Sequence, residues 1–191
     1  PALLAWYIND EQPIEHLPRL LERRRMMREL DPRHPIFAVM CQVPEFPLYG
    51  ELVDVYGIDP YPIVHPASNH IRIVEHAHDM AEVAMRSKDG MALWTAIQAH
   101  SIGAYDPRAC KDEPYYRAEY RDPTFQEMLA MSLLSAIRGA RGFVFFSYPD
   151  HATPAFDKCK RDERWNNTKR VARALRDLEG ALLSEIDAPQ P

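Results

Sequence analysis

The sequence is poor in glycine and cysteine and has no long apolar run. With only seven glycines, it lacks the Gly-rich loops that hold nucleotide phosphates. The three cysteines, Cys41, Cys110 and Cys159, lie far apart and form no C-x-x-C motif, so neither a disulfide framework nor a cysteine zinc site is indicated. No apolar stretch is long enough to span a membrane, and no nucleotide-binding or transmembrane class is favoured.

Positive charge is also in deficit. Lysine and arginine number 23 against 28 aspartates and glutamates, which gives a formal charge of −5. This balance argues against nucleic acid or an anionic membrane as a partner. The cluster Arg23-Arg24-Arg25 lies on a predicted amphipathic helix, where it is interpreted as a solvated face.

Length and composition favour a single globular domain. The chain has 191 residues, of which 46% are hydrophobic and 27% charged, which suits a substantial core. We expect the domain over residues 1–186 and a frayed tail over 187–191. The first residue is Pro1 rather than methionine, so we expect a processed chain or a piece of a longer one. The lack of a visible signal peptide therefore says nothing about compartment.

Apolar runs of strand length alternate with helix-like segments. Strands are predicted at residues 2–10, 34–41, 53–58, 91–97 and 143–148, and helices at about 13–30, 71–86, 123–138 and 165–183. A doubtful turn of helix falls within 43–52, and 99–122 reads as a long loop, which in a compact domain is usually functional or disordered. Strands that alternate with helices predict an α/β fold with a parallel sheet and right-handed crossovers.

Polar side chains follow these strands. Because the carboxyl ends of parallel strands meet at one edge of a sheet, that edge is expected to collect the candidate site. The candidates are Asp10, Glu11, Asp59, Tyr61, Gln98, His100, Tyr148 and Asp150. The count of strands fits either an open, doubly wound five-stranded sheet or the C-terminal portion of a (β/α)8 barrel with about five βα units.

Several segments resemble one family. They are residues 6–13 (WYINDEQP), 54–62 (DVYGIDPYP), Gln98, 121–128 (RDPTFQEM) and 139–143 (GARGF). In this order and spacing the chain resembles the second half of bacterial glycoside hydrolase-type TIM barrels of the broad β-galactosidase and agarase-like group. The resemblance implies that the chain supplies barrel strands 4 to 8, as a fragment whose other strands come from an upstream segment or a second copy.

The resemblance also implies carboxylate chemistry on a carbohydrate. The family's proton donor is a glutamate at the end of strand 4, where Glu11 falls, and a neighbouring Asp10 could raise its pKa. The family's second glutamate ends strand 7, but this chain has Gln98 there, and an amide cannot act as a nucleophile. The second carboxylate would then be Asp59, Asp150 or a group from the absent strands, with their spacing deciding retention or inversion.

Other residues are expected to position the sugar. Tyr61, Gln98, His100 and Tyr148 could hydrogen-bond its hydroxyls, and Trp94 could stack on a pyranose. The histidines lack metal-ligand spacing: His76 and His78 lie two apart on a predicted helix and point in different directions. No metal and no cofactor is expected.

The sequence therefore predicts a glycoside hydrolase-like barrel in which Glu11 and Asp59 are the catalytic carboxyl groups. The alternative is a carbohydrate-binding barrel without catalysis, which Gln98 favours. A third possibility is a small open-sheet α/β domain unrelated to sugars.

Overall fold

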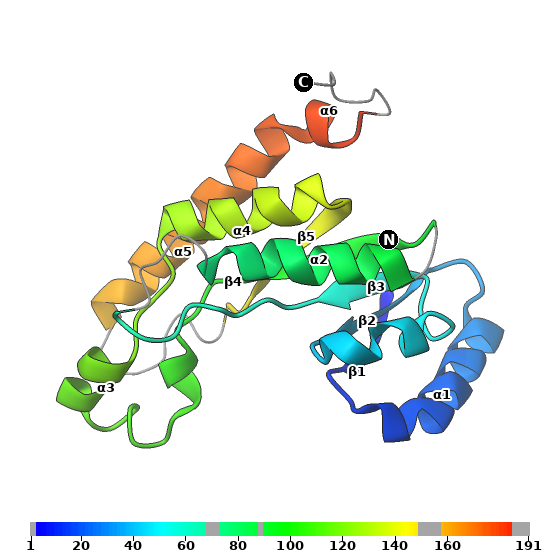
Figure 1. Ribbon diagram of the computed structural model, residues 1–191, viewed down its shortest axis with the longest axis horizontal. Coiled ribbons are helices and arrows are strands. Elements are labelled where there is room, and N and C mark those ends of the chain that lie inside the picture. Colours follow the sequence, from blue (N-terminus) through cyan, green and yellow to red (C-terminus); the bar gives the residue numbers. More distant parts are fainter. Residues whose placement is uncertain (1–2, 68–72, 88–89, 149–157, 185–191) are drawn as a thin grey trace.

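A computed structural model describes residues 3–67, 73–87, 90–148 and 158–184. Five strands form one sheet: β1 (Trp6–Asp10), β2 (Ile36–Met40), β3 (Val55–Ile58), β4 (Ala92–Gln98) and β5 (Ala140–Phe146). All neighbouring pairs are parallel, and the strands lie side by side in the order of the sequence (Figure 1). The predicted α/β class with a five-stranded parallel sheet is confirmed.

Helices connect the strands. Along the chain they are η1 (Ile14–His16), α1 (Leu17–Leu30), η2 (Val43–Tyr49), α2 (Glu75–Ser87), η4 (Ile102–Tyr105), α3 (Glu113–Glu119), α4 (Phe125–Ile137), α5 (Lys158–Asp177) and α6 (Glu179–Leu182). Figure 1 shows α2 and α4 lying alongside each other across the sheet. No described helix has the length and apolar character that a membrane crossing needs.

The strands alternate between a helix-covered face and an uncovered face, as the two-residue period of a strand requires. On β2, Ile36, Ala38 and Met40 join the main hydrophobic core, which α1, η2 and α2 help to bury. A second core forms under α2, α4 and α5 around Ile97 and Met128. The helices therefore pack against one side of the sheet.

The opposite face carries its own small cluster. Phe37, Val39 and Val55 are buried there, and Trp94 packs against them with its ring 5.0 Å from that of Phe37. Gly142 lies opposite Trp94 in the neighbouring strand, where an added Cβ would come within 2.2 Å of the indole, so only glycine fits. Further along this face, Tyr7 and Val144 are 53% and 42% exposed. Aromatic side chains therefore cover one another on a face that no described helix shields.

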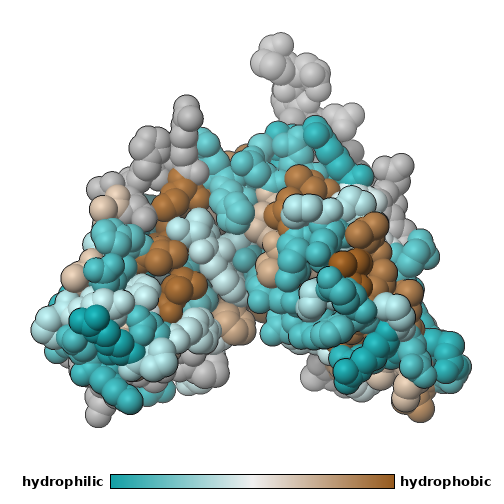
Figure 2. Space-filling model, turned by 60° about the horizontal axis from the view of Figure 1, so that its bottom comes forward, coloured by the Kyte–Doolittle hydropathy of each residue, from teal (hydrophilic) through white to brown (hydrophobic). Residues whose placement is uncertain are grey.

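The molecular surface reflects this uneven coverage. Figure 2 shows hydrophobic residues gathered in separate patches on two lobes, with an indentation between the lobes.

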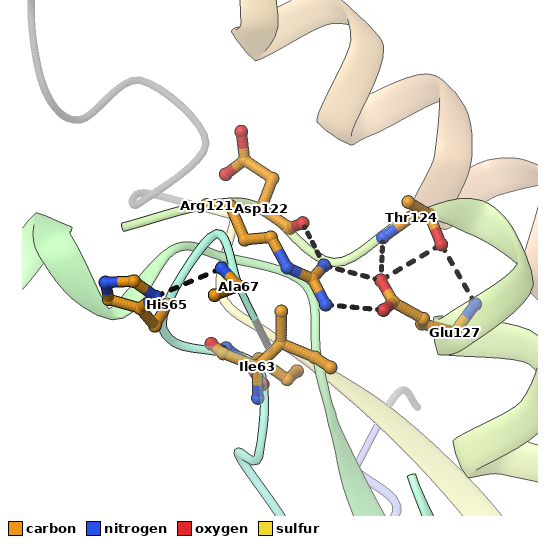
Figure 3. Close-up of polar contacts among 8 residues, drawn as sticks. Ile63, His65, Ala67, Arg121, Asp122, Thr124 and Glu127 are labelled. Atoms are coloured by element: carbon orange, nitrogen blue, oxygen red, sulfur yellow. Dashed lines mark hydrogen bonds and ion pairs between the residues drawn. The ribbon is translucent and has the colours of Figure 1, made fainter. Parts of the chain in front are cut away.

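The N-terminus of α4 is fixed by a capping box. The Thr124 hydroxyl accepts from the backbone N–H of Glu127, and the Glu127 carboxylate accepts from that of Thr124 (Figure 3). Arg121 donates to both oxygens of the same carboxylate at 2.8 and 2.7 Å. Asp122 and Thr124 are both residue types that cap helices, and Thr124 is the one that caps α4.

Asp122 instead pairs with α5. Its carboxylate accepts from the buried Arg164 at 2.7 and 3.1 Å, and Arg164 also reaches the Tyr116 hydroxyl of α3 at 3.2 Å. The segment 99–122, predicted as a loop, thus contains η4 and α3 and is tied to α5. Asp112 caps α3 by accepting from the backbone N–H of Tyr115.

Candidate functional site

Two predicted carboxyl groups meet at the carboxyl edge of the sheet. Glu11 follows β1 and Asp59 follows β3, with β2 between them. Their side chains nevertheless interact, since Glu11 contributes to the raised pKa of Asp59. Asp59 is only 6% exposed, whereas Glu11 is exposed. The pair therefore consists of a buried carboxyl group behind an accessible one.

An irregularity in β1 helps to assemble this edge. The pairing of β1 with β2 shifts between Tyr7 and Asn9, so that Tyr7 lies opposite Phe37 and Asp10 lies opposite Val39. Residues three apart in a regular strand point to opposite faces, but the shift brings both onto one face. The Tyr7 hydroxyl donates to the Asp10 carboxylate at 2.5 Å.

Glu11 holds its backbone in the left-handed region, with a φ of 50°. This conformation is unfavourable for a side chain with a Cβ. Two hydrogen bonds hold it: the Glu11 N–H donates to the Val39 carbonyl at 2.9 Å, and the Glu11 carbonyl accepts from the Gln42 amide at 3.2 Å. Backbone strain of this kind concentrates at functional sites, which singles out Glu11.

The carboxyl pair retains a proton. Burial, followed by the hydrogen bond and the charge repulsion from Glu11, raises the pKa of Asp59 to about 9. Since the buried member resists ionisation more strongly, Asp59 is the neutral partner. The arrangement follows the rule that adjacent carboxyl groups share one proton.

Neighbouring groups respond to the same charges. Burial raises the pKa of Tyr61, and Asp59 and Glu11 raise it further. Burial likewise raises the pKa of Cys41 to about 12, with contributions from Glu11 and Asp59 and a hydrogen bond to Glu11. These shifts place Tyr61 and Cys41 beside the carboxyl pair and keep both in their neutral forms.

An aromatic cluster adjoins the pair. The Tyr61 ring stacks on Phe146 at 5.9 Å and meets His100 edge-on at 5.2 Å. His100 also contacts Tyr105 and Phe146 at 5.3 and 5.5 Å. Tyr105 and Phe146 are 52% and 38% exposed. We name Tyr61, Tyr105 and Phe146 the aromatic shelf, because it offers ring surface next to the carboxyl pair.

Gln98 and His100 support this shelf from below. Both are fully buried. The Gln98 amide donates to the Ile63 carbonyl at 2.7 Å and accepts from the Ile63 N–H at 2.9 Å, and His100 Nδ1 lies 2.8 Å from the Phe146 carbonyl. Gln98 therefore clamps the loop that carries Tyr61, and His100 joins that loop to the end of β5.

The remaining predicted site residues have other neighbours than Glu11 and Asp59, or fall outside the described residues. Trp94 packs within the uncovered sheet face against Phe37. Tyr148 is 60% exposed and meets the Trp165 ring at 5.3 Å. Asp150 falls outside the described residues, so its candidacy as a second carboxylate stays a prediction.

Sequence reasoning missed Cys41, Tyr7, Tyr105 and Phe146. Cys41 directly follows β2, as the acids follow β1 and β3. The expectation that site residues follow the strands would therefore have identified it. Tyr7 needed knowledge of the strand irregularity, and Tyr105 needed the position of η4. Asn9 is a further surprise, since it is 4% exposed and neither of its side-chain polar atoms has a hydrogen-bond partner among the described residues.

Potential metal ligands gather elsewhere. Among the described residues, the group of three that could hold an ion is His78, Asp79 and Glu82. His78 lies 2.5 Å from Arg138 Nε, and Glu82 pairs with both Arg86 and Arg138. These arginines already balance the acidic charge, and the group needs no ion to explain it.

The sequence matches no protein-family model and no curated protein.

Proposed function

We propose that this chain is the C-terminal portion of a carbohydrate-active (β/α)8 barrel of the glycoside hydrolase type, with Glu11 as its working carboxyl group. The observation that carries the proposal is the strained, accessible Glu11 held against a buried, protonated Asp59 at the carboxyl edge of a parallel sheet. Active sites of (β/α)8 barrels occupy this edge.

The strand order supports a barrel arc. A doubly wound sheet reverses its strand order at a switch point, whereas these strands follow the sequence from β1 to β5 without a reversal. Right-handed crossovers in one direction place the connecting helices on one face. The uncovered face with Phe37 and Trp94 then corresponds to a barrel interior. Three further βα units, from an upstream segment or a second copy, would complete eight strands.

The spacing of the carboxyl groups defines their roles. Retaining glycosidases keep theirs about 5–5.5 Å apart and inverting ones about 6.5–9.5 Å apart. Glu11 raises the pKa of Asp59, so in our proposal the two carboxyl groups act as one unit rather than as two groups flanking a glycosidic bond. In our proposal the unit holds one proton, and Glu11, the exposed member, delivers it to the leaving oxygen. The second carboxylate comes from Asp150 or from the remaining barrel strands.

The aromatic shelf supports a carbohydrate ligand. The face of a pyranose carries C–H groups that pack on aromatic rings, and Tyr61, Tyr105 and Phe146 offer such rings beside Glu11. The Tyr61 hydroxyl stays protonated beside two carboxyl groups and is available to donate to a sugar oxygen.

Binding without catalysis is the second candidate. The contact between Glu11 and Asp59 favours it, because it leaves no flanking pair between these two residues. Calorimetry with oligosaccharides, run beside a hydrolysis assay on the same protein, separates the candidates. Binding with turnover supports the hydrolase, and binding without turnover supports the alternative.

A matched pair of variants tests the role of Glu11. Glu11→Gln removes the exchangeable proton but keeps the shape, so hydrolysis should fall by about 10²-fold or more. Glu22→Gln, an exposed change on α1, should leave hydrolysis unchanged. Equal activity in Glu11→Gln and the unmodified protein would remove Glu11 from the mechanism.

The barrel proposal has its own test, which is the intact mass of the protein made from its native gene. A mass well above 22.1 kDa supports an upstream source of the absent strands. A mass equal to that value, in a protein that native mass spectrometry finds monomeric, contradicts the completed barrel.

A further inference from the structure

A groove of about 420 Å³ runs between β1 and α1. Its described lining takes Tyr7 from the uncovered face of β1 and Ile8 from the helix-covered face, and includes no residue of β2, which places it at the open edge of β1. In a closed barrel every strand has a neighbour on both sides. A further βα unit would therefore cover this groove.

The groove is basic. Arg19 and Arg23 line it from α1, and both are exposed. Arg23 donates to the Ile8 carbonyl at 2.6 Å, which is a neutral acceptor. Among the residues that the structure describes, neither arginine forms an ion pair. Asp10 also lines the groove, but its carboxylate already accepts from the Tyr7 hydroxyl.

Other arginines of the same helix have carboxylate partners. Arg24 and Arg28 pair with Asp54, and Arg25 pairs with Glu29. The two arginines of the groove thus differ from their neighbours in lacking a carboxylate. Guanidinium groups bind carboxylates through paired N–H bonds, so a partner that covers the β1 edge is expected to bring acidic side chains.

A second copy of the chain does not meet this requirement. Its described sheet has two open edges, at β1 and at β5. Pairing through β1 would set Arg19 and Arg23 against the same two arginines. Pairing through β5 would bring α5, which lies at the opposite end of the sheet (Figure 1) and carries six arginines and lysines against three acids over residues 161–177. Both arrangements bring like charges together, which is unfavourable at an interface.

We propose that the groove beside β1 binds an acidic helix from an upstream segment of the native gene product, with carboxylates of that helix on Arg19 and Arg23. This inference rests on the proposed barrel and names the source and the charge of the unit that precedes β1. The helices of a barrel form an outer ring, so the helix of the preceding unit lies beside α1. Arg23 can bind it and keep its bond to the Ile8 carbonyl, because a guanidinium has five N–H donors.

Reversal of charge on α1 tests the proposal in the protein made from its native gene. Arg19→Glu sets a like charge against the acidic helix, whereas Arg25→Glu makes the same change outside the groove. In about 0.01 M salt, amide hydrogen exchange in β1 should be at least about tenfold faster in Arg19→Glu than in Arg25→Glu. In about 1 M salt the difference should shrink, since exposed charges are screened. In the isolated 191-residue chain the two variants should exchange alike.

The other outcomes contradict different statements. Equal exchange in the two variants of a longer gene product overturns the acidic helix and leaves the barrel standing. A difference that is already present in the isolated chain overturns it too, because the effect then belongs to α1 itself. A gene product of 22.1 kDa that forms a dimer makes the second copy the partner and also leaves the barrel standing. A monomeric product of that mass contradicts both the acidic helix and the completed barrel.

Discussion

At the scale of single residues, a buried carboxyl group that keeps its proton makes folding depend on pH. The pKa of Asp59 rises from 3.8 to about 9 on folding. A raised folded pKa contributes stability that is fully present below pH 3.8 and is lost as the pH rises toward 9. The reason is that the unfolded chain ionises while the folded protein cannot.

Replacing this group with a neutral isostere should remove the dependence. Asp59→Asn should flatten the stability curve between pH 4 and 9 and should be more stable than the unmodified protein at pH 8 by several kcal/mol. Urea unfolding at a series of pH values measures this. The exposed change Asp177→Asn is the control, and parallel curves for Asp59→Asn and the unmodified protein would show that Asp59 ionises normally.

The left-handed backbone at Glu11 gives a second prediction. Glycine tolerates a φ of 50°, whereas alanine retains the strain of a Cβ. Glu11→Gly should therefore have a free energy of unfolding about 1 kcal/mol higher than that of Glu11→Ala. Urea unfolding of the two variants measures this difference. Both variants lack the carboxylate, so their difference isolates the backbone. Equal stability would mean that the left-handed conformation is not retained in solution.

The position of Glu11 and Asp59 directly after buried strands predicted that they would share one edge of the sheet, but not that they would interact. Glu11 and Asp59 were both predicted because each directly follows a buried strand. Their contact could not be predicted, since it depends on how two side chains cross the end of β2. Tyr7 and Asp10 lie on the same face of the sheet because the pairing of β1 with β2 shifts by one residue. A strand of five residues is too short for its sequence pattern to reveal such a shift.

At the scale of elements, long periodic segments were predictable and short ones were not. All five strands were expected near their observed positions, with β2 trimmed to Ile36–Met40 and β5 displaced to Ala140–Phe146. The helix α3 was missed because its seven residues show no clear apolar period. Its start does carry a signal, namely Asp112 as a cap with Pro114 in the first turn.

The link between the 99–122 segment and α5 can be tested through its ion pair. Asp122→Asn removes a charged partner of the Arg164 guanidinium, which is 3% exposed, and such a change costs about 3 kcal/mol. The control is Glu29→Gln, since Arg25 and Glu29 are both 63% exposed and such pairs contribute about 0.5 kcal/mol or less. Thermal or urea unfolding measures both. Similar small losses would mean that the buried pair does not hold α3 and α5 together.

At the scale of the whole molecule, β1 and β5 are the two edge strands of the sheet that the described residues form. Within the described parts of the chain, each strand from β2 to β4 pairs on both sides, while β1 and β5 each pair on one. In this chain alone, hydrogen exchange should be at least about tenfold slower in β3 than in β1 and β5, because exchange follows local opening. Equal protection of all five strands at high protein concentration, lost on dilution, would show that a second copy covers the edges.

The clamp formed by Gln98 limits which side chains this strand end can accept. Its amide donates to the backbone carbonyl of Ile63 and accepts from the N–H of the same residue. A carboxylate at this position would face the Ile63 carbonyl as a second acceptor. A glutamate here would therefore force the loop that carries Tyr61 to move, so the position of that loop depends on a single amide group.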